Sequence, residues 1–157
     1  MTTYKSYSSE ETKCIAAQFA LRLTRPKRER KRALVVALNG ELGSGKTTFV
    51  QGFLAGLGLK KRALSPTFIL VRKTIITHGN FKSFFHIDAY RIRHIRELVA
   101  MDIEKIFENP KHIVLIEWAN NIREAIPRGT EQVNLSYGSK ENERIIAVAS
   151  PSGMINV

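Results

Sequence analysis

A glycine-rich segment ending in lysine and threonine stands at Gly40–Thr47, with the sequence GELGSGKT. Its spacing matches G-x-x-x-x-G-K-[ST], a loop in which glycines let backbone N–H groups close around phosphate oxygens. Lys46 would contact the β and γ phosphates as a point charge, and Thr47 would offer its hydroxyl to Mg²⁺. The candidate nucleotide-binding residues are Glu41, Leu42, Gly43, Ser44, Gly45, Lys46, Thr47 and Thr48. The segment predicts binding of a nucleoside triphosphate with Mg²⁺.

A nucleotide hydrolase also needs an acid near the metal, at the end of a neighbouring strand. The apolar run His112–Ile116 delivers Glu117 at such a place. Most sites of this kind carry aspartate, so a glutamate would coordinate the metal through water or orient the attacking water. An acid that merely caps a strand end is the alternative. Glu117 is therefore the leading candidate for the acid of this site.

Two polar segments lie between the loop and Glu117. Strand alternation would put His86, Asp88 and Tyr90 on one face if the strand runs through all three. Asp88 is the stronger catalytic candidate because a carboxylate beside bound phosphate can hold Mg²⁺ or position water, whereas His86 fits a structural role equally well. Ser65–Phe68 (SPTF) is either a plain turn or one that moves with the γ phosphate.

The surrounding elements place the loop between a buried strand and a helix. Ala33–Leu38 is a continuous apolar run typical of a strand in a mainly parallel sheet, and Thr47–Leu57 has helical periodicity. The other expected elements are a helix at Ser9–Leu23, a hairpin of Thr67–Thr77 and Phe81–Asp88, a helix at Ile95–Phe107, and a last strand pair, Gln132–Tyr137 and Arg144–Ala149. The pattern predicts an α/β fold with antiparallel strands beside parallel ones.

Composition sets the limits of the interpretation. The 157 residues are 43% hydrophobic and 25% charged, which excludes disorder and predicts a single domain over residues 1–157. Cys14 is the only cysteine, so an intrachain disulfide and a four-cysteine zinc site are impossible. No apolar stretch has the roughly 18 residues that a membrane span requires. We expect a soluble cytoplasmic protein without a membrane partner.

These motifs together resemble the TsaE (also called YjeE) family, small bacterial P-loop ATPases needed to form threonylcarbamoyladenosine on tRNA. The resemblance extends from Thr12 to the closing strand pair, so it covers nearly the whole chain. It rests on GELGSGKTTF at Gly40–Phe49, SPTF at Ser65–Phe68, HIDAYR at His86–Arg91 and IEW at Ile116–Trp118, in the family's order and spacing.

The resemblance implies a three-layer αβα P-loop NTPase fold with a mixed, mainly parallel sheet. It also implies an ATPase, weak alone, that works with TsaB-type and TsaD-type subunits in the threonylcarbamoylation of adenosine 37 of tRNAs reading codons that begin with A. Carried over by position, Thr47 and Glu117 become the Mg²⁺ pair, Asp88 a residue required for hydrolysis, and Thr12 a contact near the nucleotide base. Trp118 matches a family tryptophan in a region that senses nucleotide state.

The sequence departs from the family pattern in two places. The family usually follows the tryptophan with proline or an acid, whereas this chain has Ala119-Asn120-Asn121, and many relatives carry glycine where Met101-Asp102 stands. These changes leave the conformation of both turns open. Neither touches a proposed ligand.

Two other functions compete with the ATPase interpretation. The same loop occurs in small-molecule kinases, although no convincing substrate-closing lid is visible. The formal net charge of +11 and the basic run Arg22–Arg32, expected as a charged surface loop, suggest an RNA-binding module, but few aromatic residues accompany that run. Contact with tRNA would then be either indirect, through the partner complex, or direct, through the basic surface.

Overall fold

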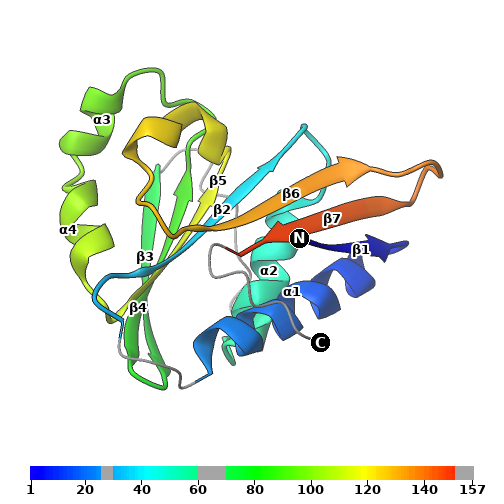
Figure 1. Ribbon diagram of the computed structural model, residues 1–157, viewed down its shortest axis with the longest axis horizontal. Coiled ribbons are helices and arrows are strands. Elements are labelled where there is room, and N and C mark those ends of the chain that lie inside the picture. The colour runs from blue at the N-terminus through cyan, green and yellow to red at the C-terminus, as the bar shows by residue number, and fades with distance from the viewer. Residues whose placement is uncertain (26–29, 60–69, 151–157) are drawn as a thin grey trace.

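The computed structural model describes residues 1–25, 30–59 and 70–150. The elements in these ranges are β1 (Thr2–Ser6), α1 (Ser9–Thr24), β2 (Leu34–Gly40), α2 (Lys46–Gly56), β3 (Val71–His78), β4 (Phe81–Asp88), α3 (Ile95–Val99), α4 (Ile103–Glu108), β5 (His112–Glu117), the 3₁₀ helix η1 (Ala119–Ala125), β6 (Glu131–Tyr137) and β7 (Arg144–Ala149). The described strands form a sheet in the order β1-β7-β6-β2-β5-β4-β3 (Figure 1).

The sheet is mixed, as the sequence predicts. Strands β6, β2, β5 and β4 lie at its centre and pair in parallel. Antiparallel strands flank them: β3 pairs with β4 on one side, and β7 and β1 extend the sheet beyond β6 on the other. Strand β1, TTYKS, is short and polar and was not predicted; its backbone pairing with β7 places it in the sheet.

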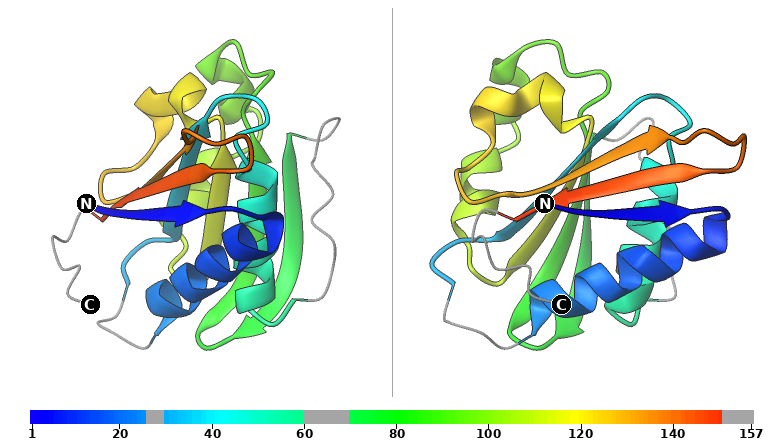
Figure 2. Two further views of the ribbon diagram at one scale, coloured as in Figure 1. Left: turned by 90° about the vertical axis from the view of Figure 1, so that its right-hand side faces the viewer. Right: turned by 45° about the vertical axis from the view of Figure 1, so that its right-hand side comes forward.

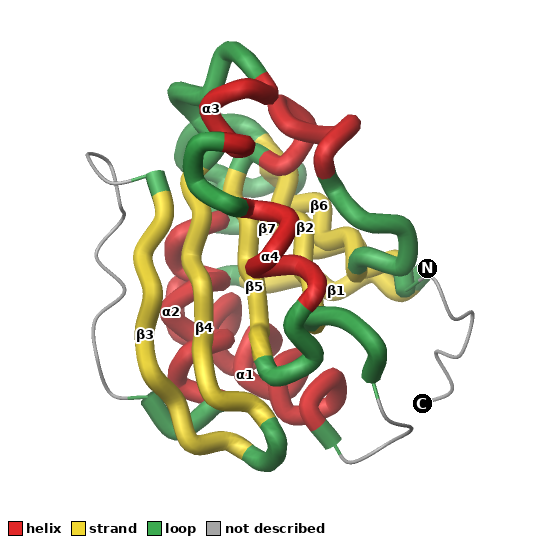
Figure 3. The backbone as a smooth tube through the Cα atoms, turned by 90° about the vertical axis from the view of Figure 1, so that its left-hand side faces the viewer, coloured by secondary structure: helices red, strands yellow, loops and turns green. Residues whose placement is uncertain are grey.

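Helices cover both faces of the sheet, which confirms the three-layer αβα fold. Along β2, Val36 and Leu38 pack with α1 and α2, whereas Val35 and Ala37 pack with α3, α4 and η1. Side chains alternate between the faces because the strand period is two residues. Figure 3 shows α3 and α4 in front of the sheet and α1 and α2 behind it, and the views in Figure 2 agree.

Helices α1 and α2 approach each other closely. A Cβ atom at Gly52 would lie 2.4 Å from the Cα atom of Lys13, so only glycine allows this backbone contact. The rings of Phe19 and Phe49 pack edge to face with centroids 5.9 Å apart. This packing fixes the position of α2, whose first turn carries Lys46 and Thr47.

One local expectation is wrong, and the condition for another is not met. The single helix expected at Ile95–Phe107 is two short helices, because Asp102 has a left-handed φ of 52°, which breaks the helical hydrogen-bond ladder. The family resemblance leads us to expect glycine at the Met101-Asp102 turn, and aspartate tolerates the left-handed region better than most residues. Tyr90 lies beyond β4, which ends at Asp88, so strand alternation does not place it.

Candidate nucleotide-binding site

The glycine-rich loop connects β2 to α2, as its pattern predicts. Gly45 is the N-cap of α2 with φ of 100°, and it provides no side-chain hydrogen bond to the helix. The first N–H groups of an α-helix have no intrahelical acceptor, and they carry the positive end of the helix dipole. The start of α2, at Lys46, Thr47 and Thr48, is therefore open to an anion.

The base of the loop is held by β6, which the sequence did not indicate. Gly40 has φ of 145°, and a Cβ atom there would lie 2.2 Å from the carbonyl oxygen of Leu135. Further along β6, the Tyr137 hydroxyl donates a hydrogen bond of 2.6 Å to the carbonyl oxygen of Leu42. Tyr137 is 95 residues from Leu42, so no local pattern could have associated it with the loop.

Lys46 lies under the loop with its ammonium group enclosed. Its Nζ donates to the carbonyl oxygens of Gly40 (2.9 Å) and Glu41 (2.8 Å). It also lies 3.7 Å from the ring centroid of Trp118, a cation–π contact. Burial lowers the pKa of Lys46, while the charges of Glu117 and Asp88 oppose that shift. The acids thus help to keep Lys46 cationic for phosphate.

Glu117 lies between Thr47 and His86. The parallel register pairs Glu117 with Asp88 of β4 and with Leu38 of β2, so the carboxyl ends of three strands meet here. The Thr47 hydroxyl donates to Oε2 of Glu117 at 3.1 Å, and Nε2 of His86 lies 2.8 Å from Oε1. Glu117 and His86 are both buried. The structure therefore brings the two expected Mg²⁺ residues together and adds His86 as a direct partner of the acid.

Asp88 is buried at the same edge of the sheet. Its Oδ1 accepts a hydrogen bond of 3.1 Å from the backbone N–H of Tyr90. The ring of Tyr90 packs against Trp118 with centroids 4.9 Å apart. Trp118 itself has a left-handed φ of 57°, which turns the chain directly after Glu117. Asp88 and Trp118 thus flank the lysine and glutamate of the site.

The donor set fits Mg²⁺ bound together with phosphate. Mg²⁺ prefers oxygen ligands and commonly takes one or two protein oxygens, with waters and phosphates completing its shell. The Thr47 hydroxyl and the Glu117 carboxylate are such oxygens. Across the described ranges, no cluster of three or more His, Cys, Asp or Glu side chains could hold a metal without such help.

The side chains of the remaining predicted site residues do not lie with Lys46, Glu117 and Asp88. Glu41 and Leu42 are exposed on the loop. Thr12 is buried near the start of α1, where its hydroxyl lies 2.7 Å from that of Ser6, so its contact with a nucleotide base stays a prediction. The SPTF segment lies outside the described residues.

One link beyond the motifs connects the site to η1. The backbone N–H of Asn120 donates 2.9 Å to Oδ1 of Asn39, the residue directly before Gly40. The helix η1 begins directly after Trp118, at the turn whose conformation the sequence left open. The end of β2 and the turn after β5 are therefore tied together.

The αβα fold with its mixed sheet, the glycine-rich loop between β2 and α2, and Glu117 opposite Thr47 define a P-loop nucleotide-binding protein. A sequence model described as threonylcarbamoyl adenosine biosynthesis protein TsaE matches residues 6–146. The chain therefore belongs to the TsaE family. Among its described helices, none is long and apolar enough to cross a membrane.

Individual relatives agree with this assignment. The chain is 38% identical over 107 residues to tRNA threonylcarbamoyladenosine biosynthesis protein TsaE of Haemophilus influenzae, covering 68% of this chain and 65% of that protein. It is 30% identical to the Bacillus subtilis protein of the same name, covering 93% of this chain and 84% of the relative. The crystal structure of Bacillus subtilis YdiB superposes with a TM-score of 0.70 at 28% identity, covering 95% of this chain and 84% of that one. The match with the Haemophilus protein thus spans just under two thirds of its length.

Proposed function

We propose that this chain hydrolyses ATP as an accessory factor in tRNA threonylcarbamoylation. It acts as a single domain in the cytoplasm, with TsaB-type and TsaD-type subunits, on the modification of adenosine 37 in tRNAs that read codons beginning with A. The observation that carries the proposal is the 3.1 Å contact between Thr47 and Glu117 beside Lys46. A hydroxyl and a carboxylate in this position are what an Mg²⁺–ATP site requires.

Each residue of the site has a separate role in this proposal. Binding of ATP exchanges the bonds from Lys46 to the carbonyls of Gly40 and Glu41 for bonds to the β and γ phosphates. Thr47 and Glu117 hold Mg²⁺, which when bound supplies neutralising charge to the phosphates. Asp88, buried at the adjacent strand end, holds the attacking water in line or accepts its proton.

The proposed pathway and the proposed partners are supported by different observations. The names of the Haemophilus and Bacillus relatives state tRNA threonylcarbamoyladenosine biosynthesis, which supports the pathway. The partner subunits and the choice of ATP follow from the family resemblance. Direct tRNA contact through basic side chains would add to the role of the complex without replacing it.

ATP turnover with and without a TsaB–TsaD pair tests the proposal. We expect slow turnover alone, stimulation by the pair, and loss of both in Lys46→Ala. Lys82→Ala, which removes an exposed lysine at the opposite end of β4 from Asp88, is the matched control and should behave as wild type. The accessory role is wrong if the pair leaves turnover unchanged and multiple-turnover tRNA modification gains nothing from ATP. A phosphorylated product in a metabolite mixture would instead favour the kinase.

A further inference from the structure

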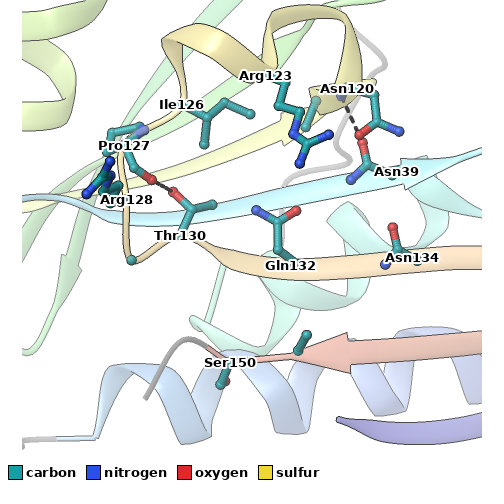
Figure 4. Close-up of a pocket in the computed structure, with 13 residues that line it drawn as sticks. Asn39, Asn120, Arg123, Ile126, Pro127, Arg128, Thr130, Gln132, Asn134 and Ser150 are labelled. Atoms are coloured by element: carbon teal, nitrogen blue, oxygen red, sulfur yellow. Dashed lines mark hydrogen bonds between the residues drawn. The ribbon is translucent and has the colours of Figure 1, made fainter. Parts of the chain in front are cut away.

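A cavity of about 600 Å³ lies beneath η1 on the face of the sheet opposite α2 (Figure 4). We call it the η1 pocket. Its floor is formed by Asn39 of β2 and by Gln132 and Asn134 of β6, which alternate with Val133 and Leu135 packed on the α1–α2 side. Its rim is η1 and the connection from Ile126 to Thr130. The phosphate-binding loop lies at the end of β2 and leads into α2 on the other face, so the pocket is a separate site.

The charge in the η1 pocket is positive and unpaired. Arg123 and Arg128 line it, and both are exposed. Within the described ranges neither guanidinium group makes a hydrogen bond or ion pair, and no carboxylate is among the lining residues. The neighbouring Glu131 is buried and accepts a hydrogen bond from the Ser150 hydroxyl. The arginines are therefore available to an external anion.

Other lining residues supply neutral hydrogen-bonding groups. Gln132 and Asn134 present side-chain amides, and Figure 4 shows Arg123 extending from η1 toward Gln132 and Asn39. Guanidinium groups form forked, charge-assisted hydrogen bonds to phosphate and carboxylate, and amides recognise neutral polar groups beside them. The volume falls within the roughly 300–1,000 Å³ of pockets that bind small molecules.

We propose that the η1 pocket binds a small anionic molecule with a phosphate or carboxylate group. Arg123 and Arg128 pair with the charged group, and Gln132 and Asn134 bind the uncharged polar part. The inference concerns a site distinct from the phosphate-binding loop and does not depend on the proposed ATPase role.

The position of the pocket couples it to the nucleotide site. Asn39 lines the pocket and directly precedes Gly40, and it accepts the hydrogen bond from Asn120 of η1. The same helix begins directly after Trp118, which lies over Lys46. An anion bound between Arg123 and Asn39 therefore contacts both η1 and the end of β2, which this hydrogen bond joins. By thermodynamic linkage, the anion and the nucleotide then change each other's affinity by the same factor.

Calorimetric titration of the full chain with inorganic phosphate, ribose 5-phosphate and citrate tests the site. We expect at least one probe to bind and the double variant Arg123→Gln/Arg128→Gln to weaken that binding at least about tenfold. Arg96→Gln, which removes an exposed arginine from α3, should leave it unchanged. Binding must also survive in Lys46→Ala, because phosphate held by the glycine-rich loop would be lost there.

The probes distinguish the chemistry of the ligand. Binding of ribose 5-phosphate without citrate indicates a phosphate ligand, and binding of citrate alone indicates a carboxylate. The proposal is overturned if none of the three binds, if the double arginine variant keeps the wild-type affinity, or if binding is lost in Lys46→Ala. Thermal unfolding of the double variant should match wild type because both arginines are exposed.

The coupling has its own test. Trp118 is the only tryptophan of the chain, so its fluorescence reports on the nucleotide site. We expect the dissociation constant of Mg²⁺–ADP, followed by this signal, to change when the probe that binds is present at saturation. An unchanged constant would show that the two sites are independent.

Discussion

Glu117 lies at the centre of the nucleotide site. It accepts a hydrogen bond from Thr47, contacts His86 and lies beside Asp88 in the register of β4 and β5. Glu117→Gln keeps the size of the side chain and removes the charge that would bind Mg²⁺ in the proposed site. We expect ATP turnover to fall by about two orders of magnitude or more.

The matched control for this substitution is Glu104→Gln, an exposed acid on α4. It should leave turnover unchanged, as measured by phosphate release. Turnover in Glu117→Gln within a fewfold of wild type would exclude Glu117 from the Mg²⁺ site.

We propose that His86 is a positioning residue, which acts through Glu117 and touches no phosphate in the proposed arrangement. Its Nε2 lies 2.8 Å from Oε1 of Glu117, and the pair is buried. Partners that orient a metal-binding carboxylate typically contribute about 10-fold to 100-fold in metal affinity or activity. We expect His86→Ala to raise the Mg²⁺ concentration for half-maximal turnover by such a factor.

The conservative variant His86→Gln keeps a polar group that can reach Oε1, and it should recover much of the Mg²⁺ affinity. A purely structural histidine would behave differently. Both variants would then lower stability in urea unfolding while leaving the Mg²⁺ dependence unchanged.

The contact between α1 and α2 is the element-scale feature that places Lys46 and Thr47. Helix propensity alone predicts that Gly52→Ala stabilises α2, by about 1 kcal/mol. A Cβ atom there would nevertheless meet the backbone of Lys13 at 2.4 Å, and overpacking of this kind costs about 1–3 kcal/mol. We therefore expect Gly52→Ala to lower the free energy of unfolding, measured by urea denaturation.

Ala55→Gly provides the comparison on the same helix. Ala55 is exposed, so its replacement should cost only the propensity term of about 1 kcal/mol. If Gly52→Ala instead raised stability, the close contact of α1 with α2 would be wrong.

The antiparallel edge of the sheet carries a pH-dependent contact. Lys5 of β1 lies 2.9 Å from Glu143, which also accepts hydrogen bonds from the backbone and hydroxyl of Ser139. These bonds lower the pKa of Glu143 from 4.5 to about 2. Because the folded value lies below the unfolded one, the contribution to stability is complete above about pH 4.5 and is lost as the pH falls toward 2.

Urea unfolding at several pH values checks this contribution. We expect the wild type to lose stability between pH 4.5 and 2, and Glu143→Gln to lose less over the same interval. Glu141→Gln, an exposed acid in the same turn, should follow the wild type. Parallel curves for wild type and Glu143→Gln would show that the carboxylate contributes nothing.

At the scale of the whole molecule, the nucleotide site is built from the centre of the fold. Its residues come from β2, β4 and β5, which contribute to both hydrophobic clusters, and from α2, which packs in the cluster on the α1–α2 side. A ligand bound here should stabilise the entire domain. At about 100 times its dissociation constant, Mg²⁺–ADP adds about 2.7 kcal/mol, which raises the Tm of a chain this long by roughly 5–11 °C.

Scanning calorimetry with and without Mg²⁺–ADP measures this shift. Lys46→Ala should abolish most of it, and Lys82→Ala should retain it. A shift of equal size in Lys46→Ala would place the nucleotide away from the glycine-rich loop.

Features that depend on neighbouring residues could be predicted from the amino-acid sequence. The spacing at Gly40–Thr47 predicted a phosphate-binding loop, and the apolar runs before it and before Glu117 predicted buried strands, as the structure shows. Hairpin β3–β4 and the pair β6–β7 follow from alternation and turn residues. Family membership followed because these segments stand in one order and spacing.

Features that depend on contacts between distant segments could be seen only in the folded chain. The sheet order brings Glu117 to Thr47 and His86, pairs polar β1 with β7, and places Tyr137 on the loop. The η1 pocket likewise combines arginines after β5 with the amides of β2 and β6. Sequence periodicity indicates which side of a helix or strand is buried, but it does not indicate which other element covers that side. These contacts between distant residues could therefore not be predicted from the sequence.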